Sequence, residues 1–467
     1  MNNGLPGRVA ILGFARSGQA LARALAERGV ALTVGDAKPR SAFEREEIAG
    51  LESAGARFFF DGPPEQFLDG AAWLAVSPGV PMGSPLVRAA RERQIEVLAE
   101  LEIAWRIAQA EAKGQNRWVA ITGTNGKSTT TAWIAEILRR AGRPVALAGN
   151  IGVPLSTFLS DRSPRDFVCE VSSFQLEAVE TFAPHVAVLT NITPDHLDRH
   201  DGFDDYARVK KRIFENQGRE DFAVVNEDDP ASRPIVTRAR RVPFSRRHRA
   251  AGGAWTEAGS LVSEIGGKAR PVVGEKELSL SGAHNVENAL AALAAADCLG
   301  TPAEAIAAGL THFRGLPHRT ERVLEADGVA WVNDSKGTNV DATKKSLEGF
   351  LPESVILILG GRDKHGDFPA LAPAVARVSR RVLTIGEAAP VIEKAFTGVV
   401  PVENAGTMER AVARAAALSR PGDTVLLSPA CASFDQYANF EERGGHFARL
   451  AREVAGDGKR ETGNERR

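Results

Sequence analysis

One segment constrains the fold more than any other part of the chain. Residues 117–122 (Arg-Trp-Val-Ala-Ile-Thr) form an apolar run, residues 123–126 (Gly-Thr-Asn-Gly) form a turn, and a helical pattern begins at Lys127. A buried strand followed at once by a glycine-containing turn and a helix is typical of a parallel α/β sheet. The backbone N–H groups of such a turn, with the helix N-terminus, point at phosphate oxygens. The segment therefore predicts a nucleotide-binding α/β domain.

The side chains of this turn suit a nucleoside triphosphate. Lys127 would neutralise the terminal phosphates, and Ser128 or Thr129 would offer a hydroxyl group to Mg²⁺. The general pattern G-x-x-x-x-G-K would put its first glycine at Ile121, so this loop is a shorter variant. The alternative is a Gly/Asn turn that happens to contain a lysine. The coincidence of strand, turn, Gly-Lys-Ser and helix favours the phosphate-binding interpretation.

Polar residues follow two further apolar runs in the same region. Glu170 ends the run 167–169, where a carboxylate at the end of a parallel strand points into the ligand crevice and can hold Mg²⁺. The alternative is a carboxylate at a helix N-terminus. Asp195 and His196 follow the run 186–189 and fit either a metal- or substrate-lining edge or a solvated acidic turn.

The first hundred residues alternate short apolar runs with helical spacing. Residues 8–12 and 31–34 are expected to be strands on either side of a helix over 17–28, and a longer helical pattern covers 97–112. Strand, helix and strand this close together imply a parallel sheet with crossover helices.

A glycine-containing turn, Gly13-Phe-Ala-Arg-Ser-Gly18, follows the first of these strands. Ala15 occupies the position where a dinucleotide fingerprint has glycine, so NAD or FAD binding is weakly supported. Asp36 ends the second strand, where an acidic side chain can bond a ribose or a base. A nucleotide in this cleft and an empty Rossmann-like scaffold are the two interpretations.

Three polar loops follow apolar strands in the last third of the chain, at residues 333–339, 360–364 and 428–436. Two lysines with adjacent hydroxyl groups suit the recognition of a small dicarboxylate. Each loop alone is compatible with ordinary turn chemistry, but three at consecutive strand ends favour a binding site.

The whole pattern predicts an α/β fold with three domains, which suits 467 residues at roughly 150 per domain. We expect a Rossmann-like N-terminal domain over 1–106, a central P-loop ATPase-like parallel-sheet domain over 107–315 and a Rossmann-like C-terminal domain over 316–467. Lys and Arg number 58 and Asp and Glu 59, so no overall basic field exists to attract nucleic acid. The absence of a signal peptide and of a membrane-length apolar run, with only three scattered cysteines, predicts a cytoplasmic protein, and we expect a monomer.

Taken together, the motifs resemble the ATP-dependent Mur ligases of peptidoglycan synthesis. The resemblance rests on TGTNGKST at 122–129, EVSSFQL at 170–176, NITPDH at 191–196 and HNVEN at 284–288. Within the family, LPHR at 316–319, NDSKGTN at 333–339 and LSPACASFDQ at 427–436 resemble the member that adds D-glutamate. The resemblance spans nearly the whole chain. It implies ATP-dependent ligation of D-glutamate to UDP-N-acetylmuramoyl-L-alanine through an acyl phosphate, giving ADP and phosphate.

The resemblance also implies roles for individual residues. Those expected to contact ATP are Gly123, Thr124, Asn125, Gly126, Lys127, Ser128, Thr129, Asn288, Arg319 and Asp334. The UDP-substrate would meet Arg16, Ser17, Asp36, Ser77 and Asn150. D-glutamate would meet Lys336, Thr338, Lys364, Ser433 and Phe440.

The metal and catalytic residues implied by the family are Lys127, Ser128, Glu170, His196 and Lys210. Ser128 and Glu170 would bind one Mg²⁺, and His196 and Lys210 would be involved in binding a second. Lys210 would act as a carbamate made with CO₂, because an ammonium is repelled by Mg²⁺ whereas a carbamate is anionic. From the residues alone, Lys210 lies in a charge run of a helix expected over 206–216, and such a run is usually a solvated face.

Two other functions stay open at this point. A folylpolyglutamate-synthase-like ligase shares the ATP-driven amide chemistry, although a dedicated N-terminal domain favours a UDP-linked substrate. A nucleotide-binding switch would hydrolyse ATP slowly and without dependence on an amino acid.

Overall fold

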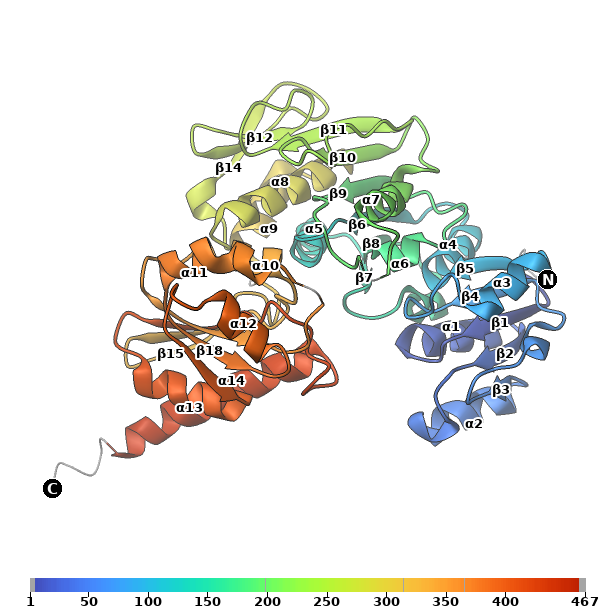
Figure 1. The fold of residues 1–467 in the computed structure, drawn as a ribbon. Coiled ribbons are helices and arrows are strands. Elements are labelled where there is room, and N and C mark those ends of the chain that lie inside the picture. The colour runs from blue at the N-terminus through green and yellow to red at the C-terminus, as the bar shows by residue number, and fades with distance from the viewer. Residues whose placement is uncertain (1–4, 198, 314, 365, 462–467) are drawn as a thin grey trace. The chain divides into compact units, whose positions relative to one another are not determined.

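The computed structural model describes residues 5–197, 199–313, 315–364 and 366–461 (Figure 1). The chain divides into two compact units, Met1–Ser279 with Val286–Phe313, and Leu280–Asn285 with Arg314–Arg467. Both units are built on mainly parallel sheets with helices between the strands, which confirms the predicted α/β fold. The first unit contains two sheets, and its division at residue 106 stays a prediction, as does the boundary at 315.

The first sheet has five parallel strands in the order β3-β2-β1-β4-β5. Its strands are β1 (Arg8–Leu12), β2 (Ala31–Gly35), β3 (Arg57–Phe59), β4 (Trp73–Val76) and β5 (Glu96–Ala99), and its helices are α1 (Arg16–Ala26), α2 (Arg45–Ser53), α3 (Pro85–Glu92) and α4 (Glu100–Glu111). The helix predicted over 97–112 is wrong at its start, because residues 97–99 belong to β5 and pair in parallel with β4. Pairing with a distant strand decides the conformation of so short an apolar run.

The second sheet has nine strands in the order β14-β13-β12-β11-β10-β9-β6-β8-β7. The strands are β6 (Arg117–Thr122), β7 (Val145–Gly149), β8 (Asp166–Glu170), β9 (Val186–Leu189), β10 (Phe222–Asn226), β11 (Arg240–Ser245), β12 (Ala254–Glu257), β13 (Ser260–Ser263) and β14 (Arg270–Gly274). The helices are α5 (Lys127–Arg140), α6 (Ser173–Leu176), α7 (Phe203–Lys211), α8 (Ala283–Cys298) and α9 (Ala303–His312). The strand predicted over 117–122 and the helix start at Lys127 are confirmed, and β6 lies between β8 and β9.

The third sheet belongs to the second unit and has the order β15-β16-β20-β17-β18-β19. Its strands are β15 (Glu321–Ala326), β16 (Val329–Asn333), β17 (Val355–Gly360), β18 (Ser379–Ile385), β19 (Val402–Gly406) and β20 (Thr424–Leu427). Helices α10 (Val340–Leu347), α11 (Ala372–Val378) and α12 (Ala389–Ala395) share one apolar cluster, and α13 (Met408–Leu418) and α14 (Phe440–Glu461) share another. Alternate residues of β17 enter the two clusters, as expected for a strand that is buried on both faces.

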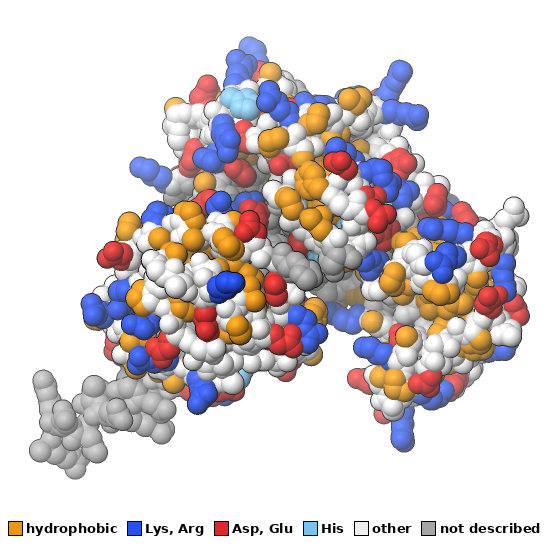
Figure 2. Space-filling model, viewed as in Figure 1, with side chains coloured by type: hydrophobic (Ala, Val, Ile, Leu, Met, Phe, Trp, Pro, Cys, Tyr) orange, Lys and Arg blue, Asp and Glu red, His pale blue; other side chains and the backbone are white. Residues whose placement is uncertain are grey.

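Basic and acidic side chains are interspersed over the face of the molecule drawn in Figure 2. This mixture agrees with the nearly equal totals of 58 basic and 59 acidic residues. Every helix within the described ranges falls short of the length and apolar character needed to cross a bilayer.

Helix α4 joins the two sheets of the first unit through buried carboxylates. Glu102 is 0% exposed and accepts hydrogen bonds from the backbone N–H groups of residues 180–182 at 2.9–3.1 Å. It also pairs with Arg106 at 2.7 Å. Glu100 accepts from the backbone N–H and the hydroxyl of Ser156, and burial raises the pKa of Glu100. These contacts connect the end of the first sheet to loops of the second.

We expect Glu102→Ala to lower the free energy of unfolding by about 3–5 kcal/mol, because the backbone N–H groups of residues 180–182 and the Arg106 guanidinium lose a fully buried acceptor. Urea unfolding measures the change. The control is Glu96→Ala. Glu96 also pairs with Arg106, but the Glu96 side chain is 49% exposed. That change should cost less than about 1 kcal/mol. Equal losses in the two variants would contradict the role of Glu102.

Candidate active site

The loop predicted to bind phosphate connects β6 to α5 at the carboxyl edge of the second sheet. Gly123 and Gly126 have φ angles of +143° and +84°, which strain any residue with a side chain. A Cβ atom on Gly123 would lie 2.0 Å from Oγ1 of Thr190, and one on Gly126 would lie 2.2 Å from Oδ1 of Asn288. Only glycine fits both positions. The close approach also places Asn288, expected to contact ATP, directly against the loop.

The segment that follows β9 holds this loop. The backbone N–H of Asn125 donates to Oδ1 of Asn191 at 3.0 Å, and the carbonyl of Asn125 accepts from Nδ2 of Asn191 at 3.0 Å and from the Thr190 hydroxyl at 2.6 Å. The Thr124 hydroxyl lies 3.2 Å from that of Tyr206 on α7. No role was predicted for Thr190, Asn191 or Tyr206. The available signal was that Thr190 and Asn191 directly follow the strand β9 and that Tyr206 lies on the helix α7.

Ser128 and Glu170 meet inside the unit, each 1% exposed. The Ser128 hydroxyl donates to Oε2 of Glu170 at 2.5 Å, and Nδ2 of Asn150 donates to Oε1 at 2.6 Å. These hard oxygen atoms fit Mg²⁺, which keeps several waters and takes one or two carboxylates together with substrate phosphates. Across the described part of the chain, no group of three or more His, Cys, Asp or Glu residues could hold a metal. Phosphate and water would therefore supply the remaining ligands.

Two lysines converge on one backbone carbonyl. Nζ of Lys127 donates to the carbonyls of Gly123 at 2.9 Å and Thr124 at 2.7 Å, and Nζ of Lys210 donates to the Gly123 carbonyl at 2.8 Å. Lys210 is 2% exposed, so it does not lie on a solvated helix face, although a charge run is usually exposed in this way. Burial lowers the pKa of Lys210 well below its usual range, and the charge of Lys127 lowers it further.

His196 lies on the turn after β9, with a φ angle of +53° and a half-buried side chain. Its ring makes an edge contact with Phe174 of α6, with centroids 5.0 Å apart. The neighbouring Asp195 accepts a hydrogen bond from the His196 backbone N–H at 2.9 Å. The charge of Asp195 also partly opposes the lowering of the Lys210 pKa.

The residues expected near the sugar nucleotide lie mostly at the carboxyl edge of the first sheet: Arg16, Ser17, Asp36 and Ser77. Asp36 accepts a hydrogen bond from the backbone N–H of Phe14 at 2.7 Å. The Ser77 hydroxyl donates to the carbonyl of Gly13 at 2.8 Å. Both side chains therefore shape the turn that follows β1. Asn150, expected in the same group, donates to Glu170 of the second sheet, and the guanidinium of Arg16 donates to the carbonyl of Gly152, two residues further along, at 2.9 Å.

In the second unit, three loops meet at Arg443 of α14. The side chain is 1% exposed and donates to the carbonyls of Ser335, Cys431 and Ala432 at 2.8–3.1 Å. Arg362 exchanges backbone hydrogen bonds with Ala432, which adds the loop 360–364. Burial lowers the pKa of Arg443 to about 10. Arg443 was not predicted, because one arginine in a charged helix carries no signal of burial.

The residues expected to bind D-glutamate lie on these loops and at the start of α14: Lys336, Thr338, Lys364, Ser433 and Phe440. Nζ of Lys336 lies 5.2 Å from the centre of the Phe440 ring. Asp334 accepts from the Ser428 hydroxyl at 2.7 Å, and burial raises the pKa of Asp334 to about 6. Asp334 and Arg319 both belong to this unit, so their contact with ATP stays a prediction.

The fold and the loop between β6 and α5 define an α/β protein of the P-loop type. Family models match as "Mur ligase middle domain" over residues 121–296 and "Mur ligase, glutamate ligase domain" over residues 318–431. The UDP-N-acetylmuramoylalanine--D-glutamate ligase of Pelotomaculum thermopropionicum is 43% identical over 95% of this chain and 97% of its own length. The ligase of the same name from Anaeromyxobacter dehalogenans is 43% identical over 96% and 98%. The solved structure of MurF from Acinetobacter baumannii shares the fold, with a TM-score of 0.61 at 20% identity over 96% of this chain and 93% of that one. The chain therefore belongs to the Mur ligase family, and it is a ligase.

We expect Arg443→Ala to lower the free energy of unfolding by about 2–4 kcal/mol, because buried carbonyls of two loops lose their donor. Urea unfolding measures the effect. Arg449→Ala is the control on the same helix, since the Arg449 side chain is 58% exposed and pairs with Glu453. The control should change the stability by less than about 0.5 kcal/mol. A neutral Arg443→Ala would show that the three loops hold together without this side chain.

Proposed function

We propose that this chain joins D-glutamate to UDP-N-acetylmuramoyl-L-alanine at the expense of ATP, as a cytoplasmic monomer in peptidoglycan precursor synthesis. The observation that carries the proposal is the identity of 43% over 95% of this chain to a relative named for that ligation. The buried loop between β6 and α5 supports a nucleotide as the phosphoryl donor, because its backbone and Lys127 offer donors to phosphate oxygens.

The reaction is proposed to proceed in two steps. The γ-phosphoryl group of ATP passes to the L-alanyl carboxylate, giving an acyl phosphate and ADP. The amine of D-glutamate then attacks the acyl carbon, and phosphate leaves from the tetrahedral intermediate. The loop 123–129, which includes Lys127, would hold the phosphates in line with the carboxylate.

Ser128 and Glu170 would hold one Mg²⁺, because their oxygen atoms already lie 2.5 Å apart in a buried position. When bound, the ion supplies positive charge that screens the phosphate oxygens. In the second unit, Lys336 and Lys364 would bind the carboxylates of D-glutamate, with Thr338, Ser433 and Phe440 fixing its orientation. Arg443 would hold the loops that carry these residues in fixed positions relative to one another.

Lys210 would act as a carbamate. Its neutral amine adds to CO₂, forming an N–C bond and releasing one proton. The burial that lowers the Lys210 pKa favours the neutral amine that this reaction needs. The resulting anion would lie beside the ammonium of Lys127 and, with His196, would hold a second Mg²⁺.

The test of the reaction is phosphate release from ATP with Mg²⁺ and UDP-N-acetylmuramoyl-L-alanine. Release should depend on D-glutamate, because in the proposed reaction its amine is the nucleophile that displaces phosphate from the acyl phosphate. Equal release with L-lysine or diaminopimelate would overturn the proposed amino acid. Phosphate release that a folate substrate stimulates would favour a folylpolyglutamate-synthase-like ligase. Slow phosphate release that no amino acid affects would favour a nucleotide-binding switch.

We expect Lys210→Ala to reduce turnover by about 100-fold or more while melting close to the wild-type temperature. Formate or acetate should restore part of the rate by occupying the anionic position left by the carbamate. Lys211→Ala is the matched control, because the next residue of a helix faces about 100° away. Wild-type activity in Lys210→Ala, or no rescue by either carboxylate, would refute the carbamate.

A further inference from the structure

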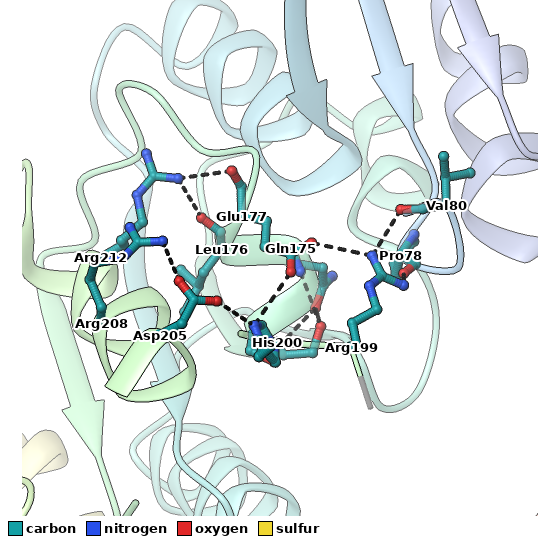
Figure 3. Close-up of polar contacts among 12 residues, drawn as sticks. Pro78, Val80, Gln175, Leu176, Glu177, Arg199, His200, Asp205, Arg208 and Arg212 are labelled. Atoms are coloured by element: carbon teal, nitrogen blue, oxygen red, sulfur yellow. Dashed lines mark hydrogen bonds and ion pairs between the residues drawn. The ribbon is translucent and has the colours of Figure 1, made fainter. Parts of the chain in front are cut away.

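The turn that carries His196 contacts the first sheet through Arg199. The guanidinium of Arg199 donates to the carbonyl of Pro78 at 2.9 Å and to that of Val80 at 2.8 Å. Figure 3 shows this side chain extending from the turn to the loop of the first sheet. The backbone N–H of Arg199 donates to the carbonyl of His196 at 3.1 Å. One residue therefore bonds both the His196 turn and the loop 78–80.

The conformation of Arg199 is set by groups on and beside α6. Its guanidinium pairs with Oε2 of Glu177 at 3.2 Å and lies 4.3 Å from the centre of the Phe174 ring. Phe174 also packs against the ring of His196. The ring of His200 lies 3.0 Å from the Ser173 hydroxyl and stacks on the ring of Phe174. The Arg199 side chain is only 17% exposed, so its hydrogen bonds are shielded from water.

The loop 77–80 adjoins the predicted sugar-nucleotide site. It follows β4, and the Ser77 hydroxyl donates to the carbonyl of Gly13 at 2.8 Å. The Ser77 carbonyl accepts from the backbone N–H of Val80 at 2.9 Å, which closes a tight turn. A ligand that orders the turns at Gly13 and Ser77 therefore also orders the carbonyls that Arg199 binds.

We propose that Arg199 is a positioning residue that couples binding of the sugar nucleotide at the loop 77–80 to the placement of the His196 turn. This inference rests on the proposed function, since it takes the UDP-substrate as the ligand of the first sheet. Arg199 does not touch the reacting atoms in this account. It acts through the Pro78 and Val80 carbonyls on one side and through His196 and Phe174 on the other.

Arginine is required for this geometry, because its planar fork binds two carbonyl oxygens at once whereas a lysine ammonium cannot span both in the same way. Arg199→Lys keeps the charge beside Glu177 and loses one carbonyl contact. Arg199→Ala loses every side-chain contact. The two variants should therefore show graded defects.

The first measurement is steady-state kinetics of the full chain. Arg199→Ala should raise the KM for UDP-N-acetylmuramoyl-L-alanine by about tenfold or more, with Arg199→Lys in between and the KM for ATP changed by less than about twofold. Arg208→Ala is the control. Arg208 belongs to the same polar cluster through Asp205 (Figure 3), but its side chain is 67% exposed. Its KM values should match those of the wild type.

The second measurement is hydrogen exchange of the segments 77–84 and 190–200. In the wild type, UDP-N-acetylmuramoyl-L-alanine should slow exchange in both segments. In Arg199→Ala and Arg199→Lys it should still slow exchange at 77–84 but lose its effect at 190–200, which a merely structural arginine would not produce.

Each outcome has one meaning. If the wild type neither binds the UDP-substrate nor ligates D-glutamate, the proposed function fails, whatever the variants do. If the wild type ligates but the substrate still protects 190–200 in both Arg199 variants, or the KM is unchanged in both, the coupling role of Arg199 is overturned. Arg199→Lys decides the matter if Arg199→Ala does not fold.

Discussion

The carbonyl oxygen of Gly123 accepts hydrogen bonds from the side chains of both Lys127 and Lys210, and this contact joins the loop between β6 and α5 to helix α7. Bringing two ammonium groups to one buried oxygen is unfavourable unless negative charge lies near. Asp195 and Glu170 provide negative charge, but burial, together with the charge of Lys127, still lowers the pKa of Lys210 well below its usual range. The packing around this carbonyl therefore decides how easily Lys210 holds its charge.

Both units use the same geometric rule. Parallel strands end at one edge of each sheet, so loops from distant parts of the chain meet there. Glycines allow the closest approaches: Gly123 lies against Thr190 in the first unit, and Gly361 against Ala432 in the second, where an added Cβ would lie 2.2 Å from a carbonyl oxygen. Each edge therefore brings together polar side chains from several loops.

Two arginines, Arg199 with a side chain 17% exposed and the buried Arg443, hold the loops at these edges. Arg199 binds carbonyls of the loop after β4, and Arg443 binds carbonyls of the loops after β16 and β20. Guanidinium groups suit this role, because several N–H donors in a rigid plane satisfy carbonyls from separate loops. Each of these arginines therefore fixes the position of the loops that it bonds.

Local order was readable from the sequence, because it depends on neighbouring residues. The strand 117–122, the glycine turn and the helix start at Lys127 follow from an apolar run and from the conformational freedom of glycine. Short strings in both units were enough to indicate the family.

The strand at residues 97–99 was not readable, because its partner β4 lies elsewhere in the chain. The sequence pattern predicts an exposed Lys210 on a charged helix face. In the structure Lys210 is buried and donates to the carbonyl of Gly123, 87 residues away. Arg443 likewise bonds Ser335, 108 residues away. The sequence alone thus determined the elements and the motifs, whereas tertiary packing decided which charges are buried and what they contact, since desolvation depends on groups brought together only by the fold.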